Sequence, residues 1–152
     1  MGLIRHRETA RIALQADSGR FLLMFSHWSP GSGLEPRWVC PGGGIEPNEE
    51  LWLAASRELQ EETGLVVDPA EFGPKVAQIE FRQDWKTGDF ETGVAHFFKF
   101  QVRDEFVIDR SFWTPEELRD ILDVRWWDVS ALEASGESVG PPGLVDLLAG
   151  LG

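Results

Sequence analysis

Three glutamates with helical spacing are the residues of this sequence best suited to chemistry. Glu58, Glu61 and Glu62 lie in the run RELQEETGL, shortly after the glycine-rich stretch PGGG at 41–44. At about 100° per residue, their carboxylates share one face of a helix within one turn. Such like charges repel one another by roughly a few tenths of a kcal/mol per pair, a cost that a solvated acidic surface can bear. Repulsion alone therefore identifies no function.

The carboxylate spacing favours a site for a divalent cation. Three carboxylates on one turn offer about six hard oxygens in a small volume, which suits Mg²⁺ or Mn²⁺. The preceding glycines let the backbone approach closely and offer its carbonyls or amides to a metal or a phosphate. Ala54 and Ala55 lie one turn earlier and would leave room for other chain segments near the site. A cation would convert the repulsion into binding.

Hydrophobic periodicity and turn residues predict the elements that position this helix. Strands are predicted at 9–16 and 20–27 as a hairpin, and at 65–67, 75–85, 92–102 and 125–129. Helices are predicted at 49–63 with Gly64 as the stop, from Thr114 with a capping box closed by Glu117, and at 141–150 after a proline. This order predicts an α/β fold in which helices cover a mixed sheet.

Composition predicts one globular domain over residues 1–152, because this length suits a single hydrophobic core. The net charge is -12 and no basic run is present, so duplex nucleic acid is not an expected partner. No apolar run approaches the ~20 residues of a membrane span, and the N-terminus lacks a secretory signal pattern. Cys40 is the single cysteine and cannot form an internal disulfide. A cytoplasmic protein that binds no membrane is expected.

The stretch from Gly43 to Leu65 resembles the signature of the Nudix hydrolases. Glu49 follows Gly43 after five residues, and RELQEETGL follows Glu49 after seven. Every specified position agrees, namely Gly43, Glu49, Arg57, Glu58, Leu59, Glu61, Glu62, Gly64 and Leu65. The preceding WVCPGGGIEP is similar to the usual lead-in of the family. The signature itself covers residues 43–65 of the chain.

This resemblance implies an α/β/α sandwich with a mixed β-sheet and a loop–helix–loop catalytic element. It also implies Mg²⁺-dependent hydrolysis, with Mn²⁺ as a substitute, of a nucleoside diphosphate linked to another group. The implied metal ligands are Glu58, Glu61, Glu62 and a backbone carbonyl of Gly42 or Gly43. Arg57 would pair with Glu49 and orient the loop against the helix. The metals would acidify a water, and a carboxylate would remove its proton.

The identity of the catalytic base stays open at this stage. Within the signature, Glu61 is a candidate beside the metal-holding catalytic residue Glu62, and many Nudix enzymes use a glutamate on a later loop instead. Glu116 and Glu117 lie in the corresponding region, although the favoured role of Glu117 is structural, in the capping box. Glu80 on a strand is a further candidate.

Substrate-binding candidates lie outside the signature. Arg11 and Arg82 point away from the apolar faces of their strands and could grip a phosphate. Trp28 and Phe81 could stack on a base, as could Trp85 and Trp113, although aromatic residues more often belong to the core. His96 is expected to be a half-buried histidine with satisfied hydrogen bonds rather than a catalyst, and Cys40 a small packing residue.

The substrate is expected to be a nucleoside di- or triphosphate derivative, with a nucleoside triphosphate as the first guess. The chain lacks the downstream proline typical of ADP-ribose pyrophosphatases and contains no tyrosine, which many dinucleoside polyphosphate hydrolases use. Two alternatives are a nucleotide sensor that does not hydrolyse its ligand and an isoprenoid diphosphate isomerase, the latter disfavoured because Cys40 lies in the lead-in. The oligomeric state is left open, a homodimer included.

Overall fold

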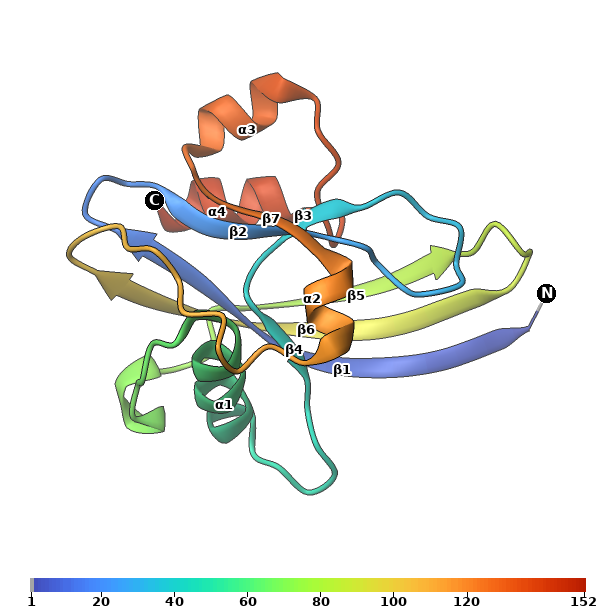
Figure 1. Ribbon diagram of the computed structural model, residues 1–152, viewed down its shortest axis with the longest axis horizontal. Coiled ribbons are helices and arrows are strands. Elements are labelled where there is room, and N and C mark those ends of the chain that lie inside the picture. Colours follow the sequence, from blue (N-terminus) through green and yellow to red (C-terminus); the bar gives the residue numbers. More distant parts are fainter. Residues whose placement is uncertain (1) are drawn as a thin grey trace.

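A seven-stranded mixed sheet forms the centre of the computed structural model, which describes residues 2–152 (Figure 1). The strands are β1 (Leu3–Ala16), β2 (Phe21–Ser26), β3 (Arg37–Val39), β4 (Gly42–Gly44), β5 (Ala77–Asp84), β6 (Phe90–Val102) and β7 (Ile121–Trp127). Their order is β3-β2-β1-β6-β5, while β4 pairs with β1 and β7 pairs with β2. β1 and β6 are parallel and the other pairs are antiparallel, which makes the sheet mixed as predicted.

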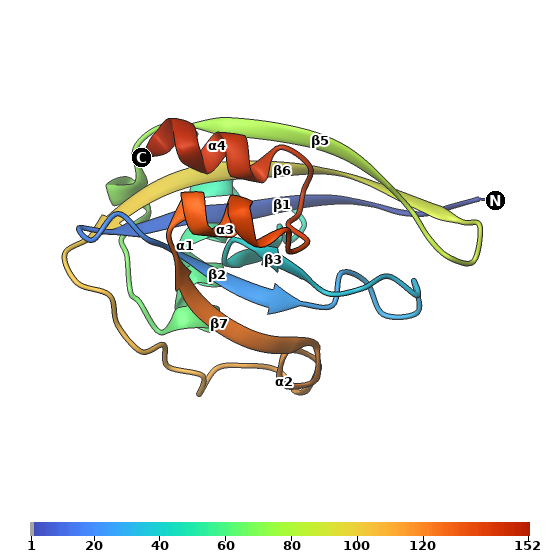
Figure 2. The same cartoon turned by 90° about the horizontal axis from the view of Figure 1, so that it is seen from above.

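Helices cover both faces of this sheet. They are α1 (Leu51–Thr63), α2 (Pro115–Asp120), α3 (Val129–Ser135) and α4 (Leu144–Leu151), and a 3-10 helix spans Pro69–Phe72. Figures 1 and 2 show α1 on one side of the sheet and α3 with α4 on the other. One apolar cluster joins Leu59 of α1 to Ile12, and a second joins Leu132 and Leu148 to Phe97. The predicted α/β/α sandwich is therefore confirmed.

Most of the predicted elements are present. β1 and β2 form the expected hairpin, and β5 and β6 lie within a few residues of their predicted ranges. α1 begins two residues later than predicted and ends as predicted, because Gly64 adopts a left-handed φ of 82° and donates to the carbonyl of Gln60. α2 begins with the predicted capping box between Thr114 and Glu117. In residues 2–152, no helix is long and apolar enough to cross a membrane.

The prediction of a strand at residues 65–67 is wrong. Side chains, not a neighbouring strand, bind the backbone there: Ser56 Oγ donates to the carbonyl of Val67 at 2.6 Å. The backbone amide of Leu65 donates to Thr63 Oγ1 at 3.2 Å. The segment therefore closes the end of α1 and leads into the 3-10 helix without joining the sheet.

The last predicted elements are shifted along the chain. The strand expected at 125–129 is β7, which starts at Ile121 and stops before Asp128, because the Asp128 side chain caps α3 by accepting from the amide of Ser130. α3 was not predicted. α4 begins at Leu144 rather than 141, because the preceding segment pairs with β3: the amide of Gly140 donates to the carbonyl of Trp38 at 3.0 Å.

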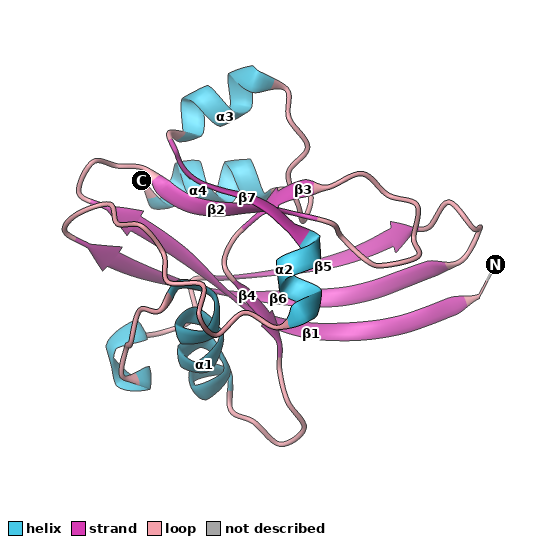
Figure 3. Cartoon of the chain, viewed as in Figure 1, coloured by secondary structure: helices cyan, strands magenta, loops and turns pink. Residues whose placement is uncertain are grey.

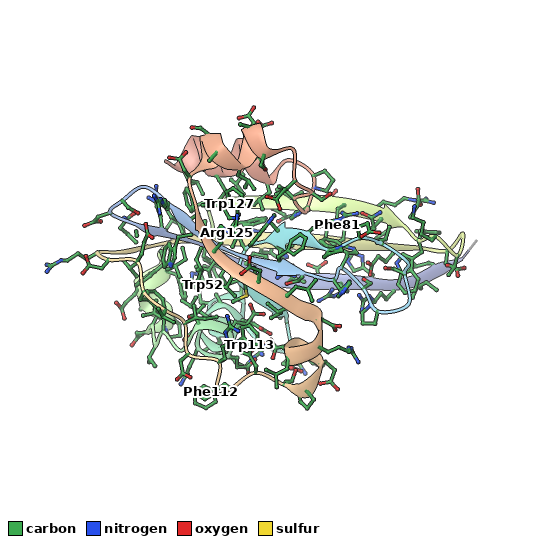
Figure 4. All side chains as sticks on the ribbon, turned by 45° about the horizontal axis from the view of Figure 1, so that its top comes forward. Trp52, Phe81, Phe112, Trp113, Arg125 and Trp127 are labelled. Carbon is green, nitrogen blue, oxygen red and sulfur yellow. The ribbon has the colours of Figure 1, made fainter. Side chains whose placement is uncertain are left out.

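The long loop between β6 and α2, coloured as loop in Figure 3, brings α2 to α1. The backbone amide of Asp109 donates to the carbonyl of Thr63 at 3.0 Å. Trp113, labelled in Figure 4, donates from Nε1 to the carbonyl of Glu62 at 2.8 Å. These contacts satisfy carbonyls at the C-terminal end of α1. They also hold α2 over the acidic face of α1.

Candidate active site

β4 and α1 carry the signature residues to the centre of the sheet. Gly42, Gly43 and Gly44 pair with residues 9–11 of β1, although the sequence predicted only a loop for them. A Cβ on Gly42 would lie 2.0 Å from the carbonyl oxygen of Ala10, and its φ of 142° favours glycine. Glycine therefore permits the close backbone approach of β4 to β1, and it also brings β4 beside Glu58 and Glu62 of α1.

Glu58 and Glu62 face a pocket of about 260 Å³ beside β4. Each is 7% exposed, and they lie four residues apart on the same face of α1. The pocket is also lined by charged residues from other elements, chiefly Arg7 and Arg11 of β1 and Glu116, Glu117 and Asp120 of α2. A concave site with convergent charged groups is the usual form of an active site.

Burial changes the protonation of the two pocket carboxylates. It raises the pKa of Glu58 to about 7, although the guanidinium of Arg57 opposes the shift. Burial raises the pKa of Glu62 well above its usual value, and the neighbouring charge of Glu58 adds to this shift. Such acids hold protons near neutral pH where no cation is bound, and a divalent cation can replace those protons.

Glu61 lies outside the pocket, towards Arg57. Its side chain is 42% exposed, and Arg57 Nη1 lies 3.3 Å and 3.4 Å from its two carboxylate oxygens. Within residues 2–152, no three acidic, histidine or cysteine side chains are grouped closely enough to hold a metal ion. The predicted cluster of three carboxylates is thus not preformed. Glu61 would have to turn away from Arg57 to join Glu58 and Glu62.

The predicted contact between Arg57 and Glu49 is present. Arg57 Nε and Nη2 donate to the two oxygens of Glu49 at 2.8 Å and 2.9 Å, a bidentate pair. Nη2 also donates to the carbonyl of Gly44 at 2.9 Å, and Nη1 to Glu58 at 3.0 Å. One guanidinium therefore connects β4, the loop before α1 and a pocket carboxylate.

Replacing Arg57 with Lys is expected to lower the free energy of unfolding by about 1 kcal/mol, because an ammonium cannot reproduce this fork of hydrogen bonds. The melting temperature, followed by circular dichroism, should fall by about 2–4 °C. Arg20→Lys is a matched control, since Arg20 makes one long contact, 3.7 Å from Glu105, at the surface. Equal melting temperatures for Arg57→Lys and the native protein would contradict the linking role of Arg57.

The donor set at Glu58 and Glu62 fits a hard divalent cation. Both supply carboxylate oxygens, which Mg²⁺ and Mn²⁺ prefer. A Cβ on Gly43 would lie 2.7 Å from the Glu58 carboxylate, so glycine keeps that carboxylate accessible. The amide of Gly42 donates to Glu62 at 3.3 Å, while the carbonyl of Gly42 accepts from Arg11 at 3.1 Å. Ala54 and Ala55, expected to leave space here, are instead packed in the core.

The predicted substrate-binding residues are separated by the fold. Arg11 and Trp28 line the pocket, and Phe81 contacts Trp28 edge to face at 5.3 Å between ring centroids. Phe81 fits there because a Cβ on Gly93 would lie 2.4 Å from its ring. Arg82 does not reach the pocket: its side chain is 61% exposed and pairs with Asp84.

The candidates for a base are also separated. Glu117 closes the capping box with Thr114, as predicted, and also lines the pocket together with Glu116. Glu80 lies outside this pocket, in a shallow surface depression with His6. His96 is buried with both ring nitrogens satisfied, by Lys75 at 3.1 Å and Glu8 at 2.8 Å, as expected for a structural histidine.

Two other predicted side chains belong to the core. Cys40 is buried, and burial raises the pKa of its thiol to about 12, so it is a poor nucleophile. Trp113 is buried against α1. Arg7 is a pocket residue that the sequence analysis did not suggest, as are His27 and Asp120. A signal existed, because Arg7 and Arg11 are four positions apart in a strand and therefore project from the same face.

Comparison with known proteins agrees with this geometry. A family model for the NUDIX domain matches residues 5–147. An RNA pyrophosphohydrolase from Nitrobacter winogradskyi is 47% identical over 58 residues, which are 38% of this chain and 29% of the relative. A diphosphoinositol polyphosphate phosphohydrolase 3-beta from Homo sapiens is 44% identical over 50 residues, which are 33% of this chain and 29% of the relative. The match spans less than a third of the length of either relative.

A solved structure shares the fold over nearly the whole chain. The MutT protein from Methanosarcina mazei Go1 has a TM-score of 0.67 and covers 95% of this chain and 91% of its own. The identity is 19%, so this likeness concerns the fold alone.

Proposed function

Because the chain belongs to the Nudix family of hydrolases, we propose that it hydrolyses a diphosphate bond in a nucleoside di- or triphosphate derivative, with Mg²⁺ as cofactor and Mn²⁺ as a substitute. The observation that carries this proposal is the pair Glu58 and Glu62, buried side by side at a pocket with raised pKa values. Two acidic groups in such a place favour a bound cation. A diphosphate needs the same cation for charge neutralisation.

The names of the relatives agree on the bond and differ on the organic group. One is named for RNA and the other for diphosphoinositol polyphosphate, and each is named for hydrolysis of a phosphate linkage. These names support the phosphate linkage as the bond that is hydrolysed. The nucleoside is proposed from the sequence signature alone. A nucleoside triphosphate remains the first substrate to try.

In the proposed mechanism, Glu58 and Glu62 would hold the cation, and Glu61 would turn from Arg57 into the pocket. When bound, the cation neutralises phosphate charge and acidifies a water. Glu61 is the most exposed of the three carboxylates, which suits it to accept a proton from the water that attacks phosphorus. The amide of Gly42 orients Glu62, and Arg57 orients Glu58. Glu58 and Glu62 would thus bind the cation, while Glu61 would accept the proton.

The organic part of the substrate is proposed to lie against Trp28 and Phe81. These rings border a second cavity of only about 10 Å³, which Arg7 and Arg11 also line and which holds no more than about one water molecule. Trp28 Nε1 and Thr9 Oγ1 are buried there without a hydrogen-bond partner among residues 2–152. A polar heterocycle would therefore enter only after Trp28 or Phe81 has turned, and these unpaired polar atoms would then lie beside it.

A nucleotide panel tests the function directly. The purified chain is incubated with nucleoside triphosphates, sugar nucleotides and dinucleotides, and released phosphate is measured after coupling to pyrophosphatase or phosphatase. We expect turnover of at least one compound with Mg²⁺ or Mn²⁺, and its loss when EDTA removes the metal. No turnover of any compound with either metal would count against the proposal.

Glu117→Gln is expected to leave kcat within about threefold and stability nearly unchanged. A glutamine can still accept from the amide of Thr114 at the third position of a capping box. The measurements are kcat with the best compound of the panel and the melting temperature. A large loss of kcat with a preserved melting temperature would instead make Glu117 the base or a further metal ligand.

The domain and its setting are part of the same proposal. Residues 1–152 are proposed to act as one Nudix domain, which the family match over residues 5–147 supports. A cytoplasmic location is proposed from the single free Cys40.

A further inference from the structure

Arg7 is a half-buried cation without a partner. Its guanidinium makes no hydrogen bond and no ion pair with any of residues 2–152. The neighbouring arginines of β1 differ from it: Arg5 donates to Glu91 at 2.7 Å and to Ser29 at 2.7 Å. Arg11 donates to the carbonyls of Cys40 and Gly42. Arg7 alone among these three keeps all its donors free.

The surroundings of Arg7 make its unpaired charge destabilising for the folded state. Burial, together with the charges of Arg11 and Arg5, lowers the pKa of Arg7 to about 10. Glu91 and Glu58 are close enough to attract Arg7, but Glu91 accepts its hydrogen bonds from Arg5 and Ser29, and Glu58 accepts from Arg57. An unpaired buried cation beside like charges destabilises a fold. An anion bound in the pocket would offset that cost.

The position of Arg7 indicates what kind of anion it binds. Arg7 lines the pocket that contains Glu58 and Glu62, and it also lines the smaller cavity with Trp28 and Phe81. It therefore lies between the proposed cation site and the proposed place of the organic group. A diphosphate joins these two parts of a nucleotide, and a guanidinium matches the oxygens of a phosphate.

We infer that Arg7 binds a phosphate of the substrate directly, through the donors that the protein leaves unpaired. This inference rests on the proposed hydrolase function, because the phosphate is taken to belong to its substrate. Arg7 thereby makes binding depend on a phosphate group next to the cation site. Arg11, whose donors are partly used by Cys40 and Gly42, assists through its charge.

Arg7→Ala and Arg7→Lys test this inference, with Arg20→Ala as a control that removes an equal charge from the surface turn. The probe is methylenediphosphonate with Mg²⁺, a non-hydrolysable diphosphate without a nucleoside, and its Kd is measured by calorimetry. We expect Arg7→Ala to raise the Kd by ~10–100-fold, as for loss of charge-assisted hydrogen bonds. Arg7→Lys should recover part of the affinity, and Arg20→Ala should match the native protein.

Kinetics and stability separate binding from a structural role. With the compound of the panel that the native chain hydrolyses fastest, Arg7→Ala should raise KM by a similar factor and keep kcat within about threefold. Its melting temperature should stay equal or rise, because an unpaired cation has been removed. A lower melting temperature with an unchanged Kd would assign Arg7 a structural role and overturn the inference.

The two proposals fail in different ways. If the native chain hydrolyses a nucleotide and Arg7→Ala has native KM and Kd, the inference about Arg7 is wrong while the hydrolase function stands. If the native chain hydrolyses nothing, yet binds methylenediphosphonate through Arg7, the hydrolase proposal fails and phosphate binding by Arg7 stands.

Discussion

Replacing Glu62 with Gln is expected to lower kcat by at least ~10²-fold, which corresponds to about 2.7 kcal/mol in the activation barrier. Glu62 is buried at the pocket and has the amide of Gly42 as its hydrogen-bond donor, 3.3 Å away. A glutamine keeps the size of the side chain and removes the charge that would hold the cation. The measurement is kcat with the best compound of the nucleotide panel at saturating Mg²⁺.

Stability shows whether such a loss of kcat reflects chemistry or unfolding. Glu62→Gln should not lower the melting temperature of the metal-free protein at pH 8, because a neutral amide of the same size replaces a buried acid whose charged form burial and Glu58 disfavour. Glu50→Gln is a matched control, since Glu50 is exposed at the N-cap of α1 and its side chain makes no capping hydrogen bond. Native kcat in Glu62→Gln would contradict its role as a metal ligand.

Glu61→Gln completes this series. Because Glu61 is exposed and paired with Arg57, its change should scarcely affect folding. If Glu61 turns into the pocket as proposed, kcat should again fall by at least ~10²-fold. Native activity in both Glu61→Gln and Glu62→Gln would remove the basis of the metal-site proposal.

The metal-free protein is expected to lose about 3 kcal/mol of stability as the pH rises from 5 to 8. The pKa of Glu58 is about 7 in the folded chain and near 4.5 in the unfolded chain. Between these values the folded state binds more protons than the unfolded state, so the free energy of unfolding falls with rising pH. A shift of this size corresponds to about 1.4 kcal/mol for each pH unit between the two values. The raised pKa of Glu62 acts in the same direction.

Urea denaturation in EDTA at pH 5, 6, 7 and 8 measures this dependence, and Glu58→Gln is the variant that should reduce its slope. Adding Mg²⁺ should raise stability more at pH 8 than at pH 5, because protons compete with the cation for the same carboxylates. A stability that is constant or rises over this range would show that Glu58 is not held as a buried, protonated acid.

Sequence and structure agree best where the determinants are local. The end of α1 follows from Gly64, which alone accepts the left-handed backbone without strain. The capping box of α2 follows from Thr114, Pro115 and Glu117, which are near one another in the chain. The pairing of Arg57 with Glu49 was expected from the family signature, and both residues lie within it. None of these features requires knowledge of distant segments.

Sequence and structure disagree where a segment far away in the chain decides the local structure. The glycines of β4 have little strand propensity of their own. They form a strand because β1 lies beside them and pairs with their backbone. The segment 65–67 has the composition of a strand, yet Ser56 and Thr63 take its backbone groups. The sequence offers Arg82 as a phosphate-binding candidate, but β5 lies at the edge of the sheet and the side chain of Arg82 pairs with Asp84 instead.

The sequence by itself determined the family of this protein and the carboxylates on which its proposed chemistry depends, because the order Gly43, Glu49, Arg57 and three glutamates places carboxylates on one helical face wherever that helix lies. Only the tertiary structure decided their environments. Packing of α1 on β1 buries Glu58 and Glu62, while Glu61 stays exposed. The same packing leaves Arg7 unpaired beside them, since burial and the choice of hydrogen-bond partner depend on segments far apart in the chain.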